Sequence, residues 1–330
     1  MPQIAITGAA GHIGGVLVRR LVAAGERPRV LVRSDRRALD GLAVDEVAGD
    51  VRDPASLAVA FRDAGLVIHL AAHVSVDGRD EAMTRAINVD GVRNVVQACL
   101  GARVKRLVHF SSIDALSPVP RDEIVDEGRA LSDGDRVPHY DRSKALGERA
   151  VLDGVARGLD AVIVNPTGVI GPFDFRPSHM GEVLLRLATR SLPGLVDGAF
   201  DWVDVRDVAA SALSAAERGA TGERYLLPGH RASLREIARL ASEATGVPVP
   251  RLVAPMWLAR AGLPIAAAYE RLRGRRSLFT ADAMRALEND RRVSGEKAAR
   301  ALGHAARPLR TTIADTYAWF GSQGLVIARA

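Results

Sequence analysis

The chain comprises 330 residues, of which 48% are hydrophobic and 25% are charged, with a formal net charge of +6 at pH 7. This is the composition of an average globular protein, which excludes disordered, collagen-like and coiled-coil architectures; at about 150 residues per domain, the length allows two domains or one large domain with an added lobe. The only cysteine, Cys99, excludes an internal disulfide framework, and neither His12 nor His109 has a partner at metal-ligand spacing, so we expect a reducing environment and no metal site.

Short apolar runs alternate with helix-period stretches from residue 3 to residue 165. The runs predict strands at 4–7, 29–32, 44–47, 66–70, 107–110 and 161–164. The stretches between them predict helices at 14–24, 54–64, 83–99 and 140–154. Such alternation is typical of βαβ units, and strands this apolar need helices on both faces of their sheet. We therefore predict an α/β fold around a doubly wound parallel sheet.

Beyond residue 165 the pattern changes to loops punctuated by proline and glycine. Helices are predicted at 206–218, 233–245 and 311–323, with one strand-like run at 224–227. We expect the chain to divide into a first domain at 1–165 and a smaller, mostly helical C-terminal lobe at 166–330. Part of 200–227 is expected to return to the first domain.

A glycine-rich string, Thr7-Gly-Ala-Ala-Gly-His-Ile-Gly14, separates the first predicted strand from the first predicted helix. At that position the chain must turn tightly, and residues without a Cβ let the backbone approach a pyrophosphate that sits on the helix N-terminus. We therefore predict that Gly8, Gly11, His12, Ile13 and Gly14 bind a dinucleotide. We therefore predict that 1–165 is a Rossmann-type dinucleotide-binding domain and that the lobe at 166–330 binds the substrate.

At the end of the second predicted strand, Val32 and Arg33 stand where an acid that binds the ribose 2′-hydroxyl of NAD would normally be. A missing acid and an arginine suit the 2′-phosphate of NADP, with the arginines at 36–37 as further donors. NADP(H) is therefore the favoured cofactor. Asp35, two residues further on, keeps NAD(H) open. After the third strand, Asp50 and Val51 are expected at the adenine edge.

Tyr140 and Lys144 are four residues apart, so a helix places them on one face. An unperturbed phenol has a pKa of about 10, and a neighbouring ammonium would lower it enough for acid-base chemistry near neutral pH. Ser112 follows a predicted strand at its carboxyl end, where open α/β sheets bind ligands, and can hydrogen-bond a substrate oxygen there.

These residues resemble the short-chain dehydrogenases/reductases of the extended type, within the superfamily of NAD-dependent epimerases and dehydratases. The resemblance covers essentially the whole chain. It is carried by these strings: Thr7-Gly8-x-x-Gly11-x-x-Gly14, Gly49-Asp50, His69-Leu-Ala-Ala72, Asn88-Val-Asp-Gly91, Ser111-Ser112, Tyr140-x-x-x-Lys144, Asn165-Pro-Thr-Gly168 and Trp202-Val-Asp-Val-Arg-Asp207.

The resemblance implies that Ser112, Tyr140 and Lys144 form the catalytic triad, with Lys144 also holding the nicotinamide ribose. It further implies that Ala71 and Ala72 line the cofactor and that the turn at Pro166 flanks the carboxamide. Asn88 and Asp207 are expected to be structural.

The string Ser112-Ile113-Asp114 bears on the subtype. Nucleotide-sugar dehydratases of this family carry an Asp-Glu pair after the catalytic hydroxyl, and Ile113 breaks that pair. The string is similar to the 3β-hydroxysteroid dehydrogenase branch, and the strand that ends in Arg33 is similar to dihydroflavonol-reductase-like members. Both branches interconvert a ketone and an alcohol on a bulky, largely apolar molecule.

Three functions follow as hypotheses. The first is an NAD(P)-dependent oxidoreductase that interconverts a ketone and a secondary alcohol, with Tyr140 as general acid and base. An NAD-dependent nucleotide-sugar epimerase with the same triad is the first alternative, and a non-catalytic dinucleotide-sensing regulator is the second. The expected partner is a small-molecule ketone or alcohol, and a homodimer is left open.

The remaining sequence features point to a cytoplasmic protein. The N-terminus has no cationic region and three glycines interrupt its first apolar segment, which is atypical of a signal peptide. The most apolar stretch, 252–269, is broken by two prolines and an arginine, so we expect no membrane span. The arginine-rich stretches 271–276 and 291–292 lack a nucleic-acid motif or interleaved aromatics; we interpret them as solvated helix faces and turns and expect no nucleic-acid partner.

Overall fold

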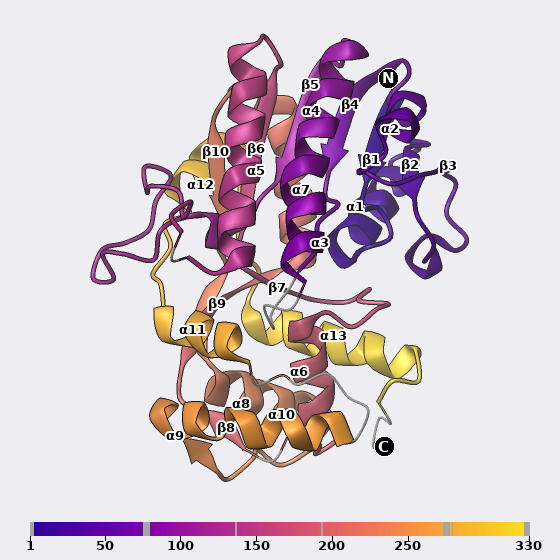
Figure 1. Cartoon of the computed structure of the whole chain (residues 1–330). Coiled ribbons are helices and arrows are strands. Elements are labelled where there is room, and N and C mark those ends of the chain that lie inside the picture. Colours follow the sequence, from indigo (N-terminus) through magenta and orange to yellow (C-terminus); the bar gives the residue numbers. More distant parts are fainter. Residues whose placement is uncertain are drawn as a thin grey trace.

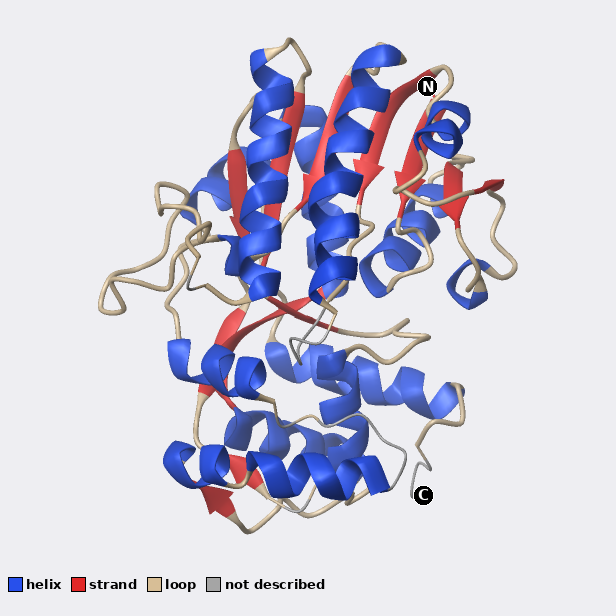
Figure 2. Ribbon diagram, in the orientation of Figure 1, coloured by secondary structure: helices blue, strands red, loops and turns tan. Residues whose placement is uncertain are grey.

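The computed structural model describes residues 3–74, 80–135, 137–192, 194–272, 278 and 280–326. A seven-stranded sheet, in which every neighbouring pair is parallel, forms its centre (Figures 1 and 2). In spatial order the strands are β3 (Asp45–Ala48), β2 (Arg29–Val32), β1 (Gln3–Thr7), β4 (Ala64–His69), β5 (Arg106–Phe110), β6 (Ala161–Pro166) and β10 (Arg224–Leu227). Every strand predicted from the sequence is present, and the predicted Rossmann-type fold is confirmed.

Helices cover both faces of this sheet. On one face lie α1 (His12–Ala23), α7 (Val205–Arg218) and α12 (Glu296–Leu302), packed in one apolar cluster with the strands. On the other face lie α2 (Pro54–Ala60), α4 (Gly91–Gly101) and α5 (His139–Ala156), in a second cluster that includes Cys99. The strands are consequently buried on both sides, which is why their sequences are continuously apolar.

The helix predicted at 83–99 differs from expectation. The structure has α3 (Glu81–Arg85), then a π-helical turn at Ala86–Asp90, then α4. Asn88 lies in that turn, where its amide bonds the backbone N–H and carbonyl of His73 at 2.8 and 2.9 Å and the hydroxyl of Ser143 at 2.9 Å. The wider turn thus presents a buried amide to two other segments, a long-range demand that local periodicity does not reveal.

The C-terminal lobe lies below the sheet in Figure 1 and is mostly helical. Its helices are α6 (His179–Ala188), α8 (Leu234–Thr245), α9 (Met256–Ala261), α10 (Leu263–Leu272), α11 (Ala281–Asn289) and α13 (Leu309–Ser322). Its short strands are β7 (Gly168–Ile170), β8 (Leu195–Val196), β9 (Ala199–Asp204), β11 (His230–Ser233) and β12 (Val253–Ala254). Of these elements the sequence predicted only α8 and α13, because none of the others is longer than 10 residues.

Two arginine-rich stretches have different outcomes. Residues 273–276 of the first stretch lie outside the described residues. In the second, Arg291 has a side chain only 9% exposed, so its interpretation as part of a solvated surface was wrong. Within the described ranges, no helix is long and apolar enough to span a bilayer.

The chain returns from the lobe to the sheet through α7 and β10. Strand β10 pairs with β6, and the buried Arg224–Glu148 ion pair, 3.0 Å from Nη2 to Oε2, joins it to α5. The Glu148 carboxylate is fully buried and also accepts a hydrogen bond of 2.5 Å from the side chain of Asn165. Because all seven strands are parallel, their carboxyl ends face the lobe together, and the loops that follow β1, β4, β5 and β6 meet there.

We predict that Arg224→Leu lowers the free energy of unfolding by about 3–5 kcal/mol, because it leaves the Glu148 carboxylate buried without its counter-charge. The double variant Arg224→Leu/Glu148→Gln should recover most of that loss. Urea unfolding at neutral pH measures both. Equal urea midpoints for the single and double variants would show that the stranded charge is not the cause.

Candidate active site

A cavity of about 920 Å³ lies between the carboxyl edge of the sheet and the lobe. It brings together most of the residues predicted from the sequence: Gly8, Gly11, His12, Ile13, Gly14, Ala72, Ser112, Tyr140, Lys144 and Pro166. Four predicted cofactor residues are not part of its lining, namely Arg33, Asp50, Val51 and Ala71. These four lie on the loops that follow β2, β3 and β4, and Ala71 packs against Gly8 of the glycine turn.

The glycine turn shows different needs at its three glycines. Gly8 has φ of +73°, and a Cβ there would lie 2.5 Å from the backbone nitrogen of Ala71. A Cβ on Gly14 would lie 2.2 Å from the carbonyl oxygen of Gly8, so both positions are dictated by the protein's own packing. A Cβ on Gly11 would meet only that same oxygen, at 3.2 Å. Gly11 therefore leaves open space where a ligand can approach the backbone.

Helix α1 begins directly after Gly11. Within the described residues no side chain caps this end, and its first turn contains no acid, so the first backbone N–H groups remain available. The ring of His12 lies 3.0 Å from the carbonyl oxygen of Pro172, which fixes that side chain beside the turn. An open cradle at an uncapped, positive helix end fits the pyrophosphate of a dinucleotide.

The loops after β2 and β3 hold several arginine–carboxylate contacts. Arg36 pairs with Glu46 at 2.6 Å, and Arg37 pairs with Asp35 at 2.7 Å. The hydrogen bond from Arg37 is the main reason that the pKa of Asp35 falls to about 2.

Asp50, at the expected adenine edge, has Arg52 at 2.7 Å and Arg33 only at 3.8 Å. The side chain of Arg33 is 60% exposed. Of the arginines expected to recognise a 2′-phosphate, Arg33 is thus the least committed to a protein carboxylate.

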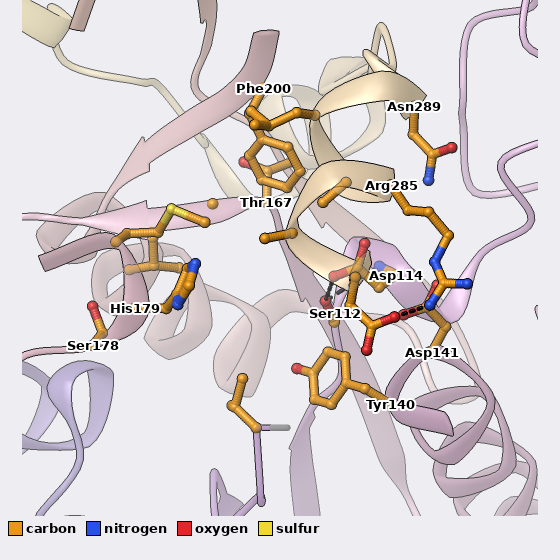
Figure 3. A pocket seen from close by; sticks show the side chains of 18 of the residues that line it. Ser112, Asp114, Tyr140, Asp141, Thr167, Ser178, His179, Phe200, Arg285 and Asn289 are labelled. Atoms are coloured by element: carbon orange, nitrogen blue, oxygen red, sulfur yellow. Dashed lines mark hydrogen bonds and ion pairs between the residues drawn. The ribbon is translucent and has the colours of Figure 1, made fainter. Parts of the chain in front are cut away.

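Ser112 and Tyr140 lie side by side at the cavity wall, with the phenol directed into the cavity (Figure 3). Asn165 donates to the Ser112 carbonyl at 2.9 Å and so holds the end of β5 against β6. Burial, and then the charge of Asp114, raise the pKa of the Tyr140 phenol, while a hydrogen bond with Ser112 acts in the opposite direction. The expectation of a lowered phenol pKa was therefore wrong for this arrangement.

Lys144 is buried behind Tyr140. Its ammonium donates to the carbonyl oxygen of Phe110 at 2.7 Å, and burial lowers its pKa to about 8 against the opposing charge of Glu148.

The stacked rings of His69 and His109, with centroids 5.3 Å apart, are also buried. Burial and the Lys144 charge lower the pKa of His69 to about 3, and the pKa of His109 is lowered by burial, His69 and Lys144. Neutral imidazoles therefore surround the ammonium.

Two carboxyl groups that the sequence analysis did not assign to the site line the cavity beside Tyr140. Asp114 accepts a hydrogen bond of 3.2 Å from the Ser112 hydroxyl and lies 3.6 Å from the guanidinium of Arg291. Burial, and then the charge of Asp114, raise the pKa of Asp141 to about 8, while Arg291 and Arg285 act in the opposite direction. Figure 3 shows both carboxyl groups and Arg285 on the same side of the cavity as Tyr140.

The rest of the cavity is mostly apolar and is built by the lobe. Its side chains include Val169, Met180, Val183, Leu195, Phe200 and Met284. Helix α11 contributes charged groups, but they are paired with each other or with α9: Arg285 with Asp282, and Glu288 with Arg260. A bulky apolar molecule therefore finds mostly apolar walls, with Ser112 and Tyr140 as polar groups on one side and further polar side chains at Thr167, Ser178, His179 and Asn289.

The missed residues fall into two groups. Asp114 and Asp141 stand within one or two positions of Ser112 and Tyr140, so their place in the sequence gave a signal. Arg285 and Arg291 come from or follow α11, far along the chain, and no motif marked them.

With this geometry in hand, comparison with known proteins identifies the family. The model for the NAD-dependent epimerase/dehydratase family matches residues 4–227. The chain belongs to that family. Its relatives are reductases and epimerases of the extended short-chain dehydrogenase/reductase type, so the protein is an enzyme and the resemblance drawn from its sequence is confirmed.

Three relatives illustrate the range. "Sterol demethylase protein B" of Methylococcus capsulatus is 38% identical over 97% of this chain and 99% of its own length. A Synechocystis protein named "Putative dihydroflavonol 4-reductase" is 33% identical over 97% of this chain and 95% of its own. The solved structure of a nucleoside-diphosphate-sugar epimerase from Pseudomonas aeruginosa covers 98% of this chain and 99% of its own, with 26% identity and a TM-score of 0.81.

We predict that Gly11→Ala leaves the fold intact and weakens dinucleotide binding at least about tenfold, because its Cβ meets only the Gly8 carbonyl oxygen, at 3.2 Å, and otherwise extends into ligand space. Thermal unfolding and cofactor titration should separate it from Gly14→Ala. The latter should lose thermal stability outright, since its Cβ meets backbone. Equal losses of thermal stability in the two variants would contradict the interpretation of Gly11 as a residue that leaves space for the ligand.

Proposed function

We propose that this enzyme interconverts a ketone and a secondary alcohol on a bulky, largely apolar molecule, with NADP(H) as the favoured cofactor. One observation carries the proposal: the Tyr140 phenol and the Ser112 hydroxyl line a mostly apolar cavity that is also lined by the glycine cradle. The volume, about 920 Å³, lies at the upper end of the usual range for small-molecule sites, about 300–1,000 Å³.

The roles of the residues follow from their positions. When bound, the nicotinamide supplies a hydride to the carbonyl carbon or accepts one from the alcohol carbon. Tyr140 gives its proton to the substrate oxygen during reduction and takes one back during oxidation. Ser112 holds the same oxygen by a hydrogen bond. We assign Lys144, whose ammonium donates to the Phe110 carbonyl, to hold the nicotinamide ribose.

The substrate class has two supports. The mostly apolar walls favour an apolar molecule, because polar groups of a sugar nucleotide buried against them would be desolvated at a cost. The two relatives named for a sterol and a dihydroflavonol also point to fused or multi-ring molecules. A nucleotide-sugar epimerase remains the alternative, favoured by the structural relative of that name. Screening ketones and nucleotide sugars with NADPH and NAD decides between them.

We predict that Tyr140→Phe lowers kcat by at least about 10²-fold on a substrate found in that screen, because the general acid is lost. Cofactor affinity should stay nearly unchanged, since the phenol acts on the substrate oxygen. Steady-state kinetics and cofactor titration measure the two effects. A Phe variant with wild-type kcat would refute the assigned role.

We predict tighter binding of NADPH than of NADH, by about ten- to a hundredfold, if Arg33 makes a charge-assisted bond worth about 1.5–3 kcal/mol to the 2′-phosphate. Arg33→Ala should lose NADPH affinity and keep NADH affinity. Arg157→Ala, an equal change of charge at the far end of α5, serves as control. Titrations at low and raised salt measure the difference, and a wild-type preference for NADH would reverse the cofactor assignment.

A further inference from the structure

We propose that Asp114, held by Arg291, is a positioning residue of the catalytic centre that directs the Ser112 hydroxyl and keeps Tyr140 in its protonated, proton-donating form. The inference rests on the proposed function, because it concerns the acid in that reaction. It goes beyond that function in assigning a bias toward reduction to two residues outside the triad.

The geometry of a short turn carries the first step. Asp114 lies in a 3₁₀ turn at Ile113–Ala115 that Ser112 caps. The Ser112 oxygen accepts from the Asp114 backbone N–H at 3.2 Å, and the Ser112 hydroxyl donates to the Asp114 carboxylate, also at 3.2 Å. The Ser112 hydroxyl has a single proton, so its bond to Asp114 competes with its hydrogen bond to Tyr140, which lowers the pKa of the phenol.

Arg291 fixes this turn from the C-terminal lobe. Its Nη1 donates to the carbonyl oxygens of Ile113 at 2.9 Å and Leu116 at 3.3 Å, and its Nη2 lies 3.6 Å from the Asp114 carboxylate. The arginine itself is held in place, because the neighbouring Arg292 carbonyl accepts from the Val125 backbone N–H at 2.9 Å. One buried guanidinium therefore sets the turn that carries Ser112.

The charges around Tyr140 act in one direction. Asp114 and Asp141 both raise the pKa of the phenol, by their negative charge. Asp141 itself has its pKa raised to about 8, first by burial and then by the charge of Asp114. Arg285 faces Asp141 and is also paired with Asp282.

A nearby carboxylate disfavours phenolate, and a phenol that keeps its proton serves as an acid. The Ser112 hydroxyl, which donates to Asp114, has only that one proton with which to stabilise phenolate. Lys144 would favour phenolate by its positive charge, but burial lowers the pKa of its ammonium to about 8, so that charge is lost as the pH rises. The arrangement therefore suits proton donation to a forming alcohol more than proton removal from one.

The decisive test titrates Tyr140 directly, by tyrosinate absorbance as a function of pH, with and without NADP⁺. The chain has four tyrosines, so the Tyr140 transition is identified by its loss in Tyr140→Phe. We expect Asp114→Asn and Asp114→Ala to move that transition to lower pH by about one unit. Asp114→Glu, which keeps the charge, should leave the transition nearer to its wild-type pH. Asp153→Asn, at an exposed site on α5, the helix that carries Tyr140, should not shift the transition.

A second readout uses a substrate from the screen. In Asp114→Asn, alcohol oxidation should begin at a pH lower by the same shift, while cofactor affinity is unchanged. Two neutral variants, Asp114→Asn and Asp114→Ala, are included because the test needs only one of them to fold. Urea unfolding shows which of them does. The inference is overturned if Tyr140 in the neutral variants ionises at the wild-type pH. It is also overturned if no Tyr140 ionisation is seen in either neutral variant up to the highest pH at which the protein stays folded. If no ketone is turned over, the proposed function is wrong. The tyrosinate titration, which needs no substrate, would then still test the effect of Asp114 on Tyr140.

Discussion

The parallel arrangement of the central sheet is the constraint on which the rest of this structure depends. Strands buried on both faces cannot place polar side chains along their length, so polar residues gather where the strands end. Because the strands are parallel, these ends lie at one edge. The glycine turn after β1, Ser112 after β5 and Asn165 in β6 meet there for that reason, although they are far apart in the sequence.

The burial of that edge determines its electrostatics. Lys144, Tyr140 and Asp141 each have a pKa displaced toward the neutral form, with burial as the largest cause. The structure tolerates these groups because specific contacts offset part of the desolvation, such as the Phe110 carbonyl for the ammonium. Burying these groups lowers the stability of the fold. The two apolar clusters on either face of the sheet provide the stabilisation that offsets this loss.

How much the sequence reveals depends on the range of the interactions. The glycine turn and the Tyr140–Lys144 spacing act within one or two helical turns, so spacing alone located them. The helix at 83–99 contained a π-helical turn because Asn88 serves distant segments. Arg291 looked like a surface arginine, since its partners, the carbonyls of Ile113 and Leu116, belong to a loop far earlier in the chain. The direction of the Tyr140 pKa shift was missed for the same reason: it depends on burial by the lobe.

The return of β10 to the sheet affects how such a chain can be divided or recombined. A fragment ending at residue 165 would lack β10, leaving the hydrogen-bonding edge of β6 open, and would lack α7, uncovering an apolar face. Open edges and apolar faces promote association of incomplete chains. Exchanging whole C-terminal halves between relatives is thus unfavourable. Substrate range can change more safely through the segments that line the cavity between β7 and β9 and along α11, because these can vary while the sheet keeps all of its strands.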